Sequence, residues 1–141
     1  MSRRKKIPQS IKLNNPLNLH YSEHHIWPGL HPRHPEVDTY CNFLTLEHGY
    51  CAALQLILSY MRTYRLLTPA AIVYRWAPPT HNKTHLYLAA VCALAGLDQN
   101  ELIEDMSIEM LQLLVAMTRM ESGLRPDVTY LMDLCGKYGI E

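Results

Sequence analysis

The residues best suited to bind a ligand lie in the run 75–82, where two prolines follow an arginine and a tryptophan. A helix cannot continue through Pro78 and Pro79, so the chain must turn there and begin a new helix behind Asn82. This turn gathers a guanidinium, an indole ring and an amide, which suit a polar ligand that contains a ring. The predicted ligand-binding residues here are Arg75, Trp76, Asn82 and Tyr87.

Glu121 is the carboxylate with the best setting for acid catalysis. It ends the apolar run 113–120 and precedes Ser122 and Gly123, where the chain must turn and expose it. Cleavage of a glycosidic bond needs a carboxylic acid that keeps its proton near neutral pH, and a partly apolar cleft has this effect. We therefore predict Glu121 as a catalytic acid, with Glu23 as the alternative. The other interpretation of Glu121 is a solvated residue at a helix end.

Histidine is the residue type that raises the question of a metal site. Five histidines fall within residues 20–34, namely His20, His24, His25, His31 and His34. Histidine is a common zinc ligand, but four prolines between positions 16 and 35 argue against the helix that would bring His20 and His24 to one side. The sequence H-E-x-x-H is also absent. We expect a solvated histidine-rich loop, with no metal and no other cofactor.

Apolar spacing predicts the elements that must position these residues. From residue 46 onward, apolar side chains recur at three- and four-residue intervals, which indicates amphipathic helices. We expect helices at about 47–65, 69–77, 83–95, 107–121 and 126–135. The expected N-caps are Thr45, Thr68 and either Asp105 or Ser107, and the expected stops are Gly96, Gly123 and Gly136.

The same pattern predicts which helix faces are buried. On the helix at 83–95 the predicted inward residues are Leu86, Ala90, Ala93 and Leu94. On the helix that follows they are Ile108, Leu111, Leu114, Val115 and Thr118. Residues 13–42 show little periodicity and hold five prolines or glycines, so we expect an irregular wall there, suited to binding. At most a small β-hairpin precedes residue 47.

Length and charge indicate one domain with a basic tail. A chain of 141 residues can bury a core of its own. Five of its 13 basic residues lie in the first twelve positions, and the remainder is mildly acidic. We expect a flexible basic arm at 1–12 and a single compact, mainly α-helical domain at 13–141. The acidic body argues against nucleic acid as a partner.

Other composition signals bear on the compartment. The N-terminal segment lacks the apolar run of a signal peptide, and no apolar window is long enough to cross a membrane. The four cysteines show no C-x-x-C spacing, which favours buried free thiols. We therefore expect synthesis in a reducing cytoplasm and no membrane partner.

Several motifs occur in a specific order along the chain: Asn14-Asn15-Pro16-Leu17-Asn18-Leu19, Trp27-Pro28-Gly29-Leu30, Phe43 before Gly49-Tyr50, and the run 74–84. Together they resemble a family of small phage and prophage proteins that includes virion structural proteins and lysozyme-like murein hydrolases. The resemblance covers roughly residues 13–123. It implies a lysozyme-like helical fold, action on peptidoglycan, and a substrate-binding role for Asn15, Asn18 and Trp27.

Two further segments resemble peptidoglycan-cleaving enzymes. Glu121-Ser122 looks like the catalytic segment of lytic transglycosylases and related glucosaminidases, and Thr84-x-x-Tyr87 looks like the Thr/Tyr motif of transglycosylases. In those enzymes the glutamate comes early in the domain, so the resemblance implies a circularly permuted relative.

The chain also departs from the phage family. His81 stands where the relatives usually have an acid in the turn, and His20 and Cys51 stand where they have arginines. If the missing acid is catalytic in the family, this chain is inactive; if that acid only caps the helix or contacts glycan, His81 is a tolerated change.

Two functions therefore remain open. The first is a phage- or mobile-element-derived enzyme that cleaves the peptidoglycan glycan strand, as a glycosidase or lytic transglycosylase. The alternative is a non-catalytic virion structural or glycan-binding protein on the same scaffold. The expected partners are the glycan strand and virion components, with action at the cell wall or in a virion.

Overall fold

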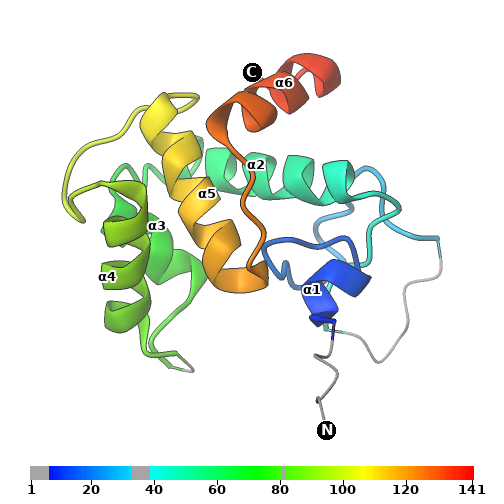
Figure 1. The fold of residues 1–141 in the computed structure, drawn as a ribbon, viewed down its shortest axis with the longest axis horizontal. Helices are drawn as coiled ribbons and strands as arrows, with labels where there is room; N and C mark the ends of the chain where they lie inside the picture. The colour runs from blue at the N-terminus through cyan, green and yellow to red at the C-terminus, as the bar shows by residue number, and fades with distance from the viewer. Residues whose placement is uncertain (1–6, 33–38, 81) are drawn as a thin grey trace, which may run out of the picture.

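The computed structural model describes residues 7–32, 39–80 and 82–141, and it is mainly helical, as the sequence predicts. Its elements are α1 (Gln9–Lys12), α2 (Leu46–Arg62), α3 (Pro69–Trp76), α4 (Thr84–Ala95), α5 (Ile108–Ser122) and α6 (Val128–Tyr138). Figure 1 shows α2 crossing the molecule, with α3, α4 and α5 grouped on one side and α1 on the other. In the described part of the chain, no helix has the length and apolar character needed to span a membrane.

Side-chain caps fix where most of the helices begin. Thr45, Thr68 and Ser107 accept hydrogen bonds from the backbone amides three residues ahead, which confirms three predicted caps. Asp127 does the same for α6, so this helix begins at Val128 and not at Pro126. It also ends later than expected, because Gly139 and not Gly136 adopts the left-handed conformation that stops it.

The core is built around α2, which is buried along most of its length. Its inward side chains include Leu54, Ile57 and Met61, each at most 1% exposed. They pack with α5 residues such as Met110 and Leu113 in one continuous apolar cluster. α2 ends at Arg62, three residues before the predicted end.

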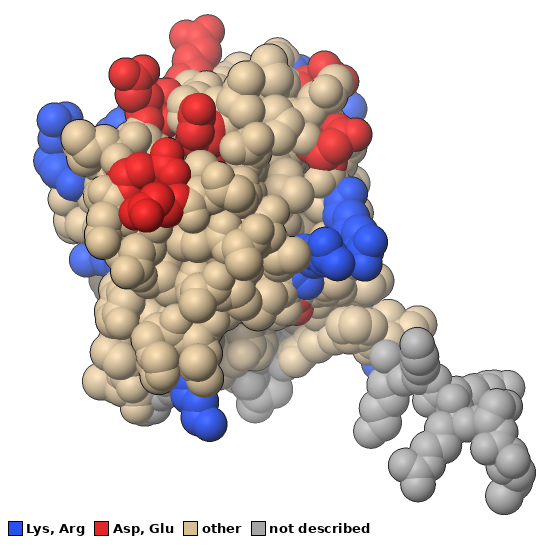
Figure 2. All heavy atoms as spheres, turned by 60° about the vertical axis from the view of Figure 1, so that its left-hand side comes forward, with Lys and Arg blue, Asp and Glu red and all other residues tan. Residues whose placement is uncertain are grey.

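The predicted inward face of α4 is wrong. Leu86 and Leu94 are 56% and 44% exposed, while the buried residues are Thr84, Leu88, Val91 and Cys92. α4 is apolar on nearly every side, so the sequence pattern cannot select the face that packs against α3 and α5. Figure 2 views the side that holds α3 and α4 and shows a broad area without charged side chains.

Two further expectations need correction near helix starts. Ile108 is 56% exposed, because it is the first residue of α5 and lies beyond the buried part of that helix; Met110 and Leu113 fill the core in its place. Residues 9–12, expected within the flexible arm, form α1, which packs against α5. Ser10 of α1 is buried, and its carbonyl accepts a hydrogen bond from the amide of Asn15 at 2.8 Å. Residues 1–6 lie outside the described part of the chain.

The described residues within 13–42, namely 13–32 and 39–42, form the irregular wall that the sequence predicts. The small hairpin expected before residue 47 is reduced to isolated antiparallel bridges, His20 with Tyr40 and Leu30 with Phe43 among the described residues. The four cysteines are buried free thiols, as expected. Burial raises the pKa of the Cys41 and Cys51 thiols to about 11, so neither is an activated nucleophile.

Candidate functional site

A cavity of about 330 Å³ opens where the irregular wall meets the ends of α3 and α5. The residues that line it are Asn18, Leu19, His20, Ser22, His25, Trp27, Tyr40, Leu56, Tyr60, Trp76, Ala77, Asn82 and Glu121. We call the lining residues 18–40 the loop wall, and the remaining six the helical wall. The predicted residues Asn18, Trp27, Trp76, Asn82 and Glu121 therefore meet at one cavity, although they come from distant parts of the sequence.

The helical wall is positioned by the turn between α3 and α4. Trp76 is the last residue of α3, and the Thr84 hydroxyl at the start of α4 donates a hydrogen bond to the carbonyl of Ala77. The Asn82 side-chain amide donates to the carbonyl of Pro78 at 3.0 Å. These bonds hold the two helix ends together across the Pro-Pro turn, as the sequence indicates. Figure 1 shows this turn at the same end of the molecule as the C-terminus of α5.

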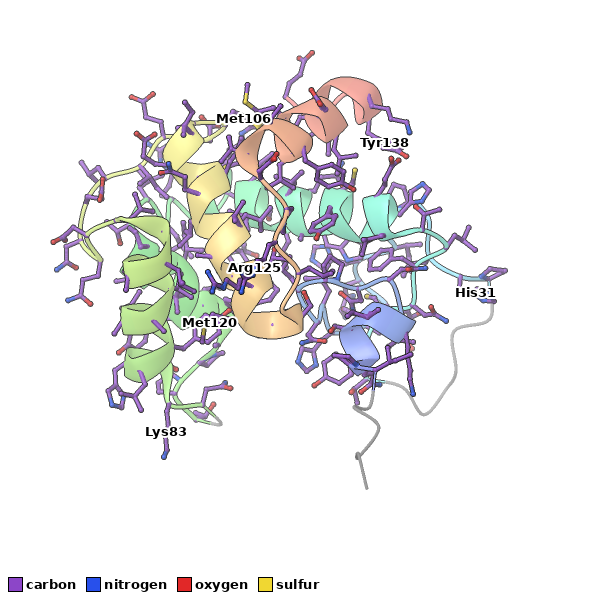
Figure 3. All side chains as sticks on the ribbon, in the orientation of Figure 1. His31, Lys83, Met106, Met120, Arg125 and Tyr138 are labelled. Carbon is purple, nitrogen blue, oxygen red and sulfur yellow. The ribbon has the colours of Figure 1, made fainter. Side chains whose placement is uncertain are left out.

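Glu121 reaches the cavity from the last turn of α5. This turn is anchored by the hydroxyls of Thr118 and Ser122, which donate to the carbonyls of Leu114 and Thr118 at 2.7 and 3.0 Å. Gly123 then ends the helix with φ 75°, as predicted. Figure 3 labels Met120 on the C-terminal part of α5 and Arg125 on the segment that follows this helix.

The environment of Glu121 favours its protonated form. Burial raises the pKa of this carboxyl above its usual range, and hydrogen bonding from Asn18 opposes part of the shift. A carboxylate near a helix C-terminus is also disfavoured by the helix dipole. No lysine or arginine is among the described residues that line the cavity. Glu121 is therefore not a freely solvated helix-end residue.

Asn18 joins the loop wall to the helical wall. Its side-chain amide donates to the backbone carbonyl of Glu121 at 3.2 Å, which supplies a partner for a carbonyl at the end of α5. Asn18 has φ 54°, in the left-handed region that asparagine tolerates better than most residues.

Asn15 and Tyr87, both predicted to bind substrate, are not among the lining residues. Asn15 is 0% exposed and donates to the carbonyls of Leu19 and Cys41, both at 3.0 Å, so it holds the loop wall in shape. Tyr87 has a buried hydroxyl that lies close to the Trp76 indole. Burial, and to a lesser extent the charge of Glu121, raise the pKa of Tyr87, and the contact with Trp76 lowers it in part.

Arg75 and Glu23 are also not among the described residues that line the cavity. The Arg75 guanidinium sits 4.0 Å from the ring centre of Tyr64 and 5.5 Å from that of Tyr60. Because Tyr60 lines the cavity, Arg75 supports the helical wall from behind. Glu23 is exposed, and His81 lies outside the described residues.

Several lining residues were not among the predicted site residues, chiefly His20, His25, Tyr40 and Tyr60. The ring centres of His25 and Trp27 are 5.3 Å apart in a stacked pair, and those of His20 and Tyr40 are 4.8 Å apart. The first pair is close in sequence and could have been noticed. The second depends on a bridge between residues twenty positions apart, which no local pattern reveals.

The described residues contain no group of three or more histidine, cysteine or acidic side chains able to hold a metal ion. No protein-family model matches the sequence. A search of curated proteins likewise found no match.

Proposed function

We propose that this protein cleaves the glycan strand of peptidoglycan, with Glu121 as the general acid. The observation that carries the proposal is a carboxyl whose pKa is raised by burial, in an open cavity that it shares with Trp76 and Asn82. A glycosidase needs such a group to protonate the departing sugar oxygen. Indole faces and amide groups beside it are suited to bind the apolar faces and polar substituents of sugar rings.

The proposed reaction begins with proton transfer from Glu121 to the glycosidic oxygen as the C–O bond breaks. The leaving sugar departs as an alcohol while the acetamido oxygen of the substrate bonds to the anomeric carbon, and Glu121 becomes a carboxylate. A water molecule then attacks that carbon, the acetamido group is released, and Glu121 accepts the proton of the water. Asn18 opposes part of the rise in the carboxyl pKa and so favours the ionised form of Glu121. Opposing effects of burial and Asn18 on the pKa suit a group that must both give and take a proton.

The described residues that line the cavity favour a reaction that uses one protein carboxylate. Glu121 is the sole acidic residue among the described residues that line the cavity. Most glycosidases use two carboxylates, but a 2-acetamido sugar can supply its own nucleophile. Peptidoglycan sugars carry this group, so the substrate can complete the reaction that Glu121 begins. Residues 36 and 38, both acidic, lie outside the described part of the chain.

The alternative is a non-catalytic glycan-binding or virion structural protein. Two observations favour it: His81 stands where the resembled family has an acid, and the described lining offers no second carboxylate. On this alternative, the same cavity binds the glycan strand or a virion component without cleaving it.

Release of soluble muropeptides from purified peptidoglycan separates the two functions. We expect release by the wild-type protein and a loss of about 10²–10⁴-fold in E121Q, the usual contribution of a general acid. Glu104 is exposed and outside the cavity lining, so E104Q is the matched control and should retain activity. Absence of release by the folded wild-type protein from several peptidoglycan types would favour the binding alternative, and release unaffected by E121Q would redirect the search to Glu23.

A further inference from the structure

The loop wall carries rings that the proposed chemistry of Glu121 does not use. Trp27 and His25 stack with an angle of 16° between their rings, and His20 and Tyr40 form a second, tilted pair. All four side chains line the cavity. The helical wall holds its own aromatic rings, Trp76 and Tyr60. Flat aromatic surfaces are therefore present on both walls, and each can receive a separate ring of a ligand.

Backbone hydrogen bonds hold the loop wall in place. The amide of Tyr21 donates to the carbonyl of Thr39 at 2.7 Å, and that of Cys41 donates to Leu19 at 2.8 Å. The buried Asn15 side chain adds its bonds to Leu19 and Cys41 beneath them. Rings carried on a backbone fixed in this way lose little freedom when they bind a ligand, which favours affinity.

The chemistry of the loop wall selects an uncharged ligand with apolar faces and polar edges. Its described lining residues include no lysine, arginine or acidic side chain, whereas Ser22 and the two imidazole rings offer hydrogen bonds. N-acetylated sugars fit this description, because the C–H face of the ring packs on an aromatic surface while hydroxyl and acetamido groups point outward.

We infer that the loop wall is a second sugar-binding subsite, built on the stacked Trp27–His25 pair. The natural ligand is then a chain of at least two linked N-acetylated sugars, with one ring on the Trp76 side of Glu121 and the next on Trp27. The identity of the ligand as a sugar rests on the proposed function; the presence of two separate ring-binding surfaces rests on the geometry.

Binding of sugars of increasing length tests this inference. Tryptophan fluorescence of E121Q, which prevents turnover, is titrated with N-acetylglucosamine, its β-1,4-linked dimer and its tetramer. We expect the dimer to bind at least about tenfold more tightly than the monomer, because it engages a second aromatic surface. H25A and W27A, each made in the E121Q background, should reduce this gain to less than about threefold.

Two control variants lie outside the cavity lining. H85A removes an exposed histidine of α4 and Y74A an exposed aromatic ring of α3, and both should keep the full gain. Trp27 packs partly against the core, whereas His25 is exposed, so H25A remains informative if W27A fails to fold.

The inference is overturned if monomer and dimer bind equally, or if both loop-wall variants keep the gain. A length-dependent gain lost in H25A supports the subsite even if muropeptide release fails, in which case the protein is a glycan-binding protein. Release by the wild-type protein without any length dependence of binding would instead support the proposed function and reject the subsite.

Discussion

The two walls of the cavity are held in place by different means. The helical wall depends on helix ends: the Thr68 cap, the Pro-Pro turn and the glycine that ends α5 set the positions of Trp76, Asn82 and Glu121. The loop wall has isolated bridges in place of regular structure, and the buried Asn15 supplies side-chain bonds beneath it. The helical wall is therefore secured by bonds between residues close in sequence, whereas the loop wall also depends on bonds between distant segments, such as those of Cys41 with Leu19 and Asn15.

The largest expected effect comes from removing the Asn15 side chain, which holds the loop wall in shape. N15A deletes an amide that donates to two backbone carbonyls and accepts from the Leu19 amide at 2.8 Å. Because these groups are buried, we expect the free energy of unfolding to fall by about 2–4 kcal/mol in denaturant titrations. The exposed Asn100 is the control, and N100A should change stability by less than about 0.5 kcal/mol. Equal effects of the two variants would contradict the role given to Asn15.

A smaller loss is expected when the helical wall loses one bond. T84V keeps the shape of a buried side chain but removes the hydroxyl that donates to the carbonyl of Ala77. We expect a loss of about 1–2 kcal/mol, measured in the same way. T129V alters an exposed threonine of α6 and should be nearly neutral. If T84V destabilised the protein as much as N15A, the distinction between the walls would fail.

The pH dependence of stability tests the environment of Glu121. Its folded-state pKa is raised, so the protonated carboxyl favours the folded state at low pH, and this advantage is lost as pH rises through the folded-state pKa. The stability of E121Q relative to wild type should therefore increase as pH rises from the unfolded-state glutamate pKa of about 4.3 to the raised folded-state pKa. The increase should be about 1.4 kcal/mol for each unit by which the pKa is raised. A difference independent of pH would show that the carboxyl is ordinarily solvated.

The smallest effect is expected behind the helical wall. R75M removes the guanidinium from the faces of Tyr64 and Tyr60, which contributes about 0.5–1 kcal/mol at an exposed site. Because Arg75 is not among the described residues that line the cavity, R75M should weaken binding of the sugar dimer by less than about threefold. R119M, at an exposed position of α5, is the control. A loss above tenfold for R75M alone would mean that Arg75 contacts the ligand directly.

The difference between the walls also explains what the sequence could predict. Caps, prolines and glycines act within a few residues, so the ends of α3 and α5 and the positions of Trp76, Asn82 and Glu121 could be inferred. The buried face of α4 could not, because its residues are apolar on nearly every side. The pairing of His20 with Tyr40 and the burial of Asn15 depend on contacts between distant segments, which spacing does not record.

The most direct test of the central claim is the rate of muropeptide release by the wild-type protein as a function of pH. A general acid works while it holds its proton, and burial raises the pKa of Glu121. We predict release that is sustained above the ordinary glutamate pKa of about 4.3 and declines as pH rises through the raised value. The absence of release at every pH at which the protein is folded would contradict the assignment of Glu121 as a catalytic acid.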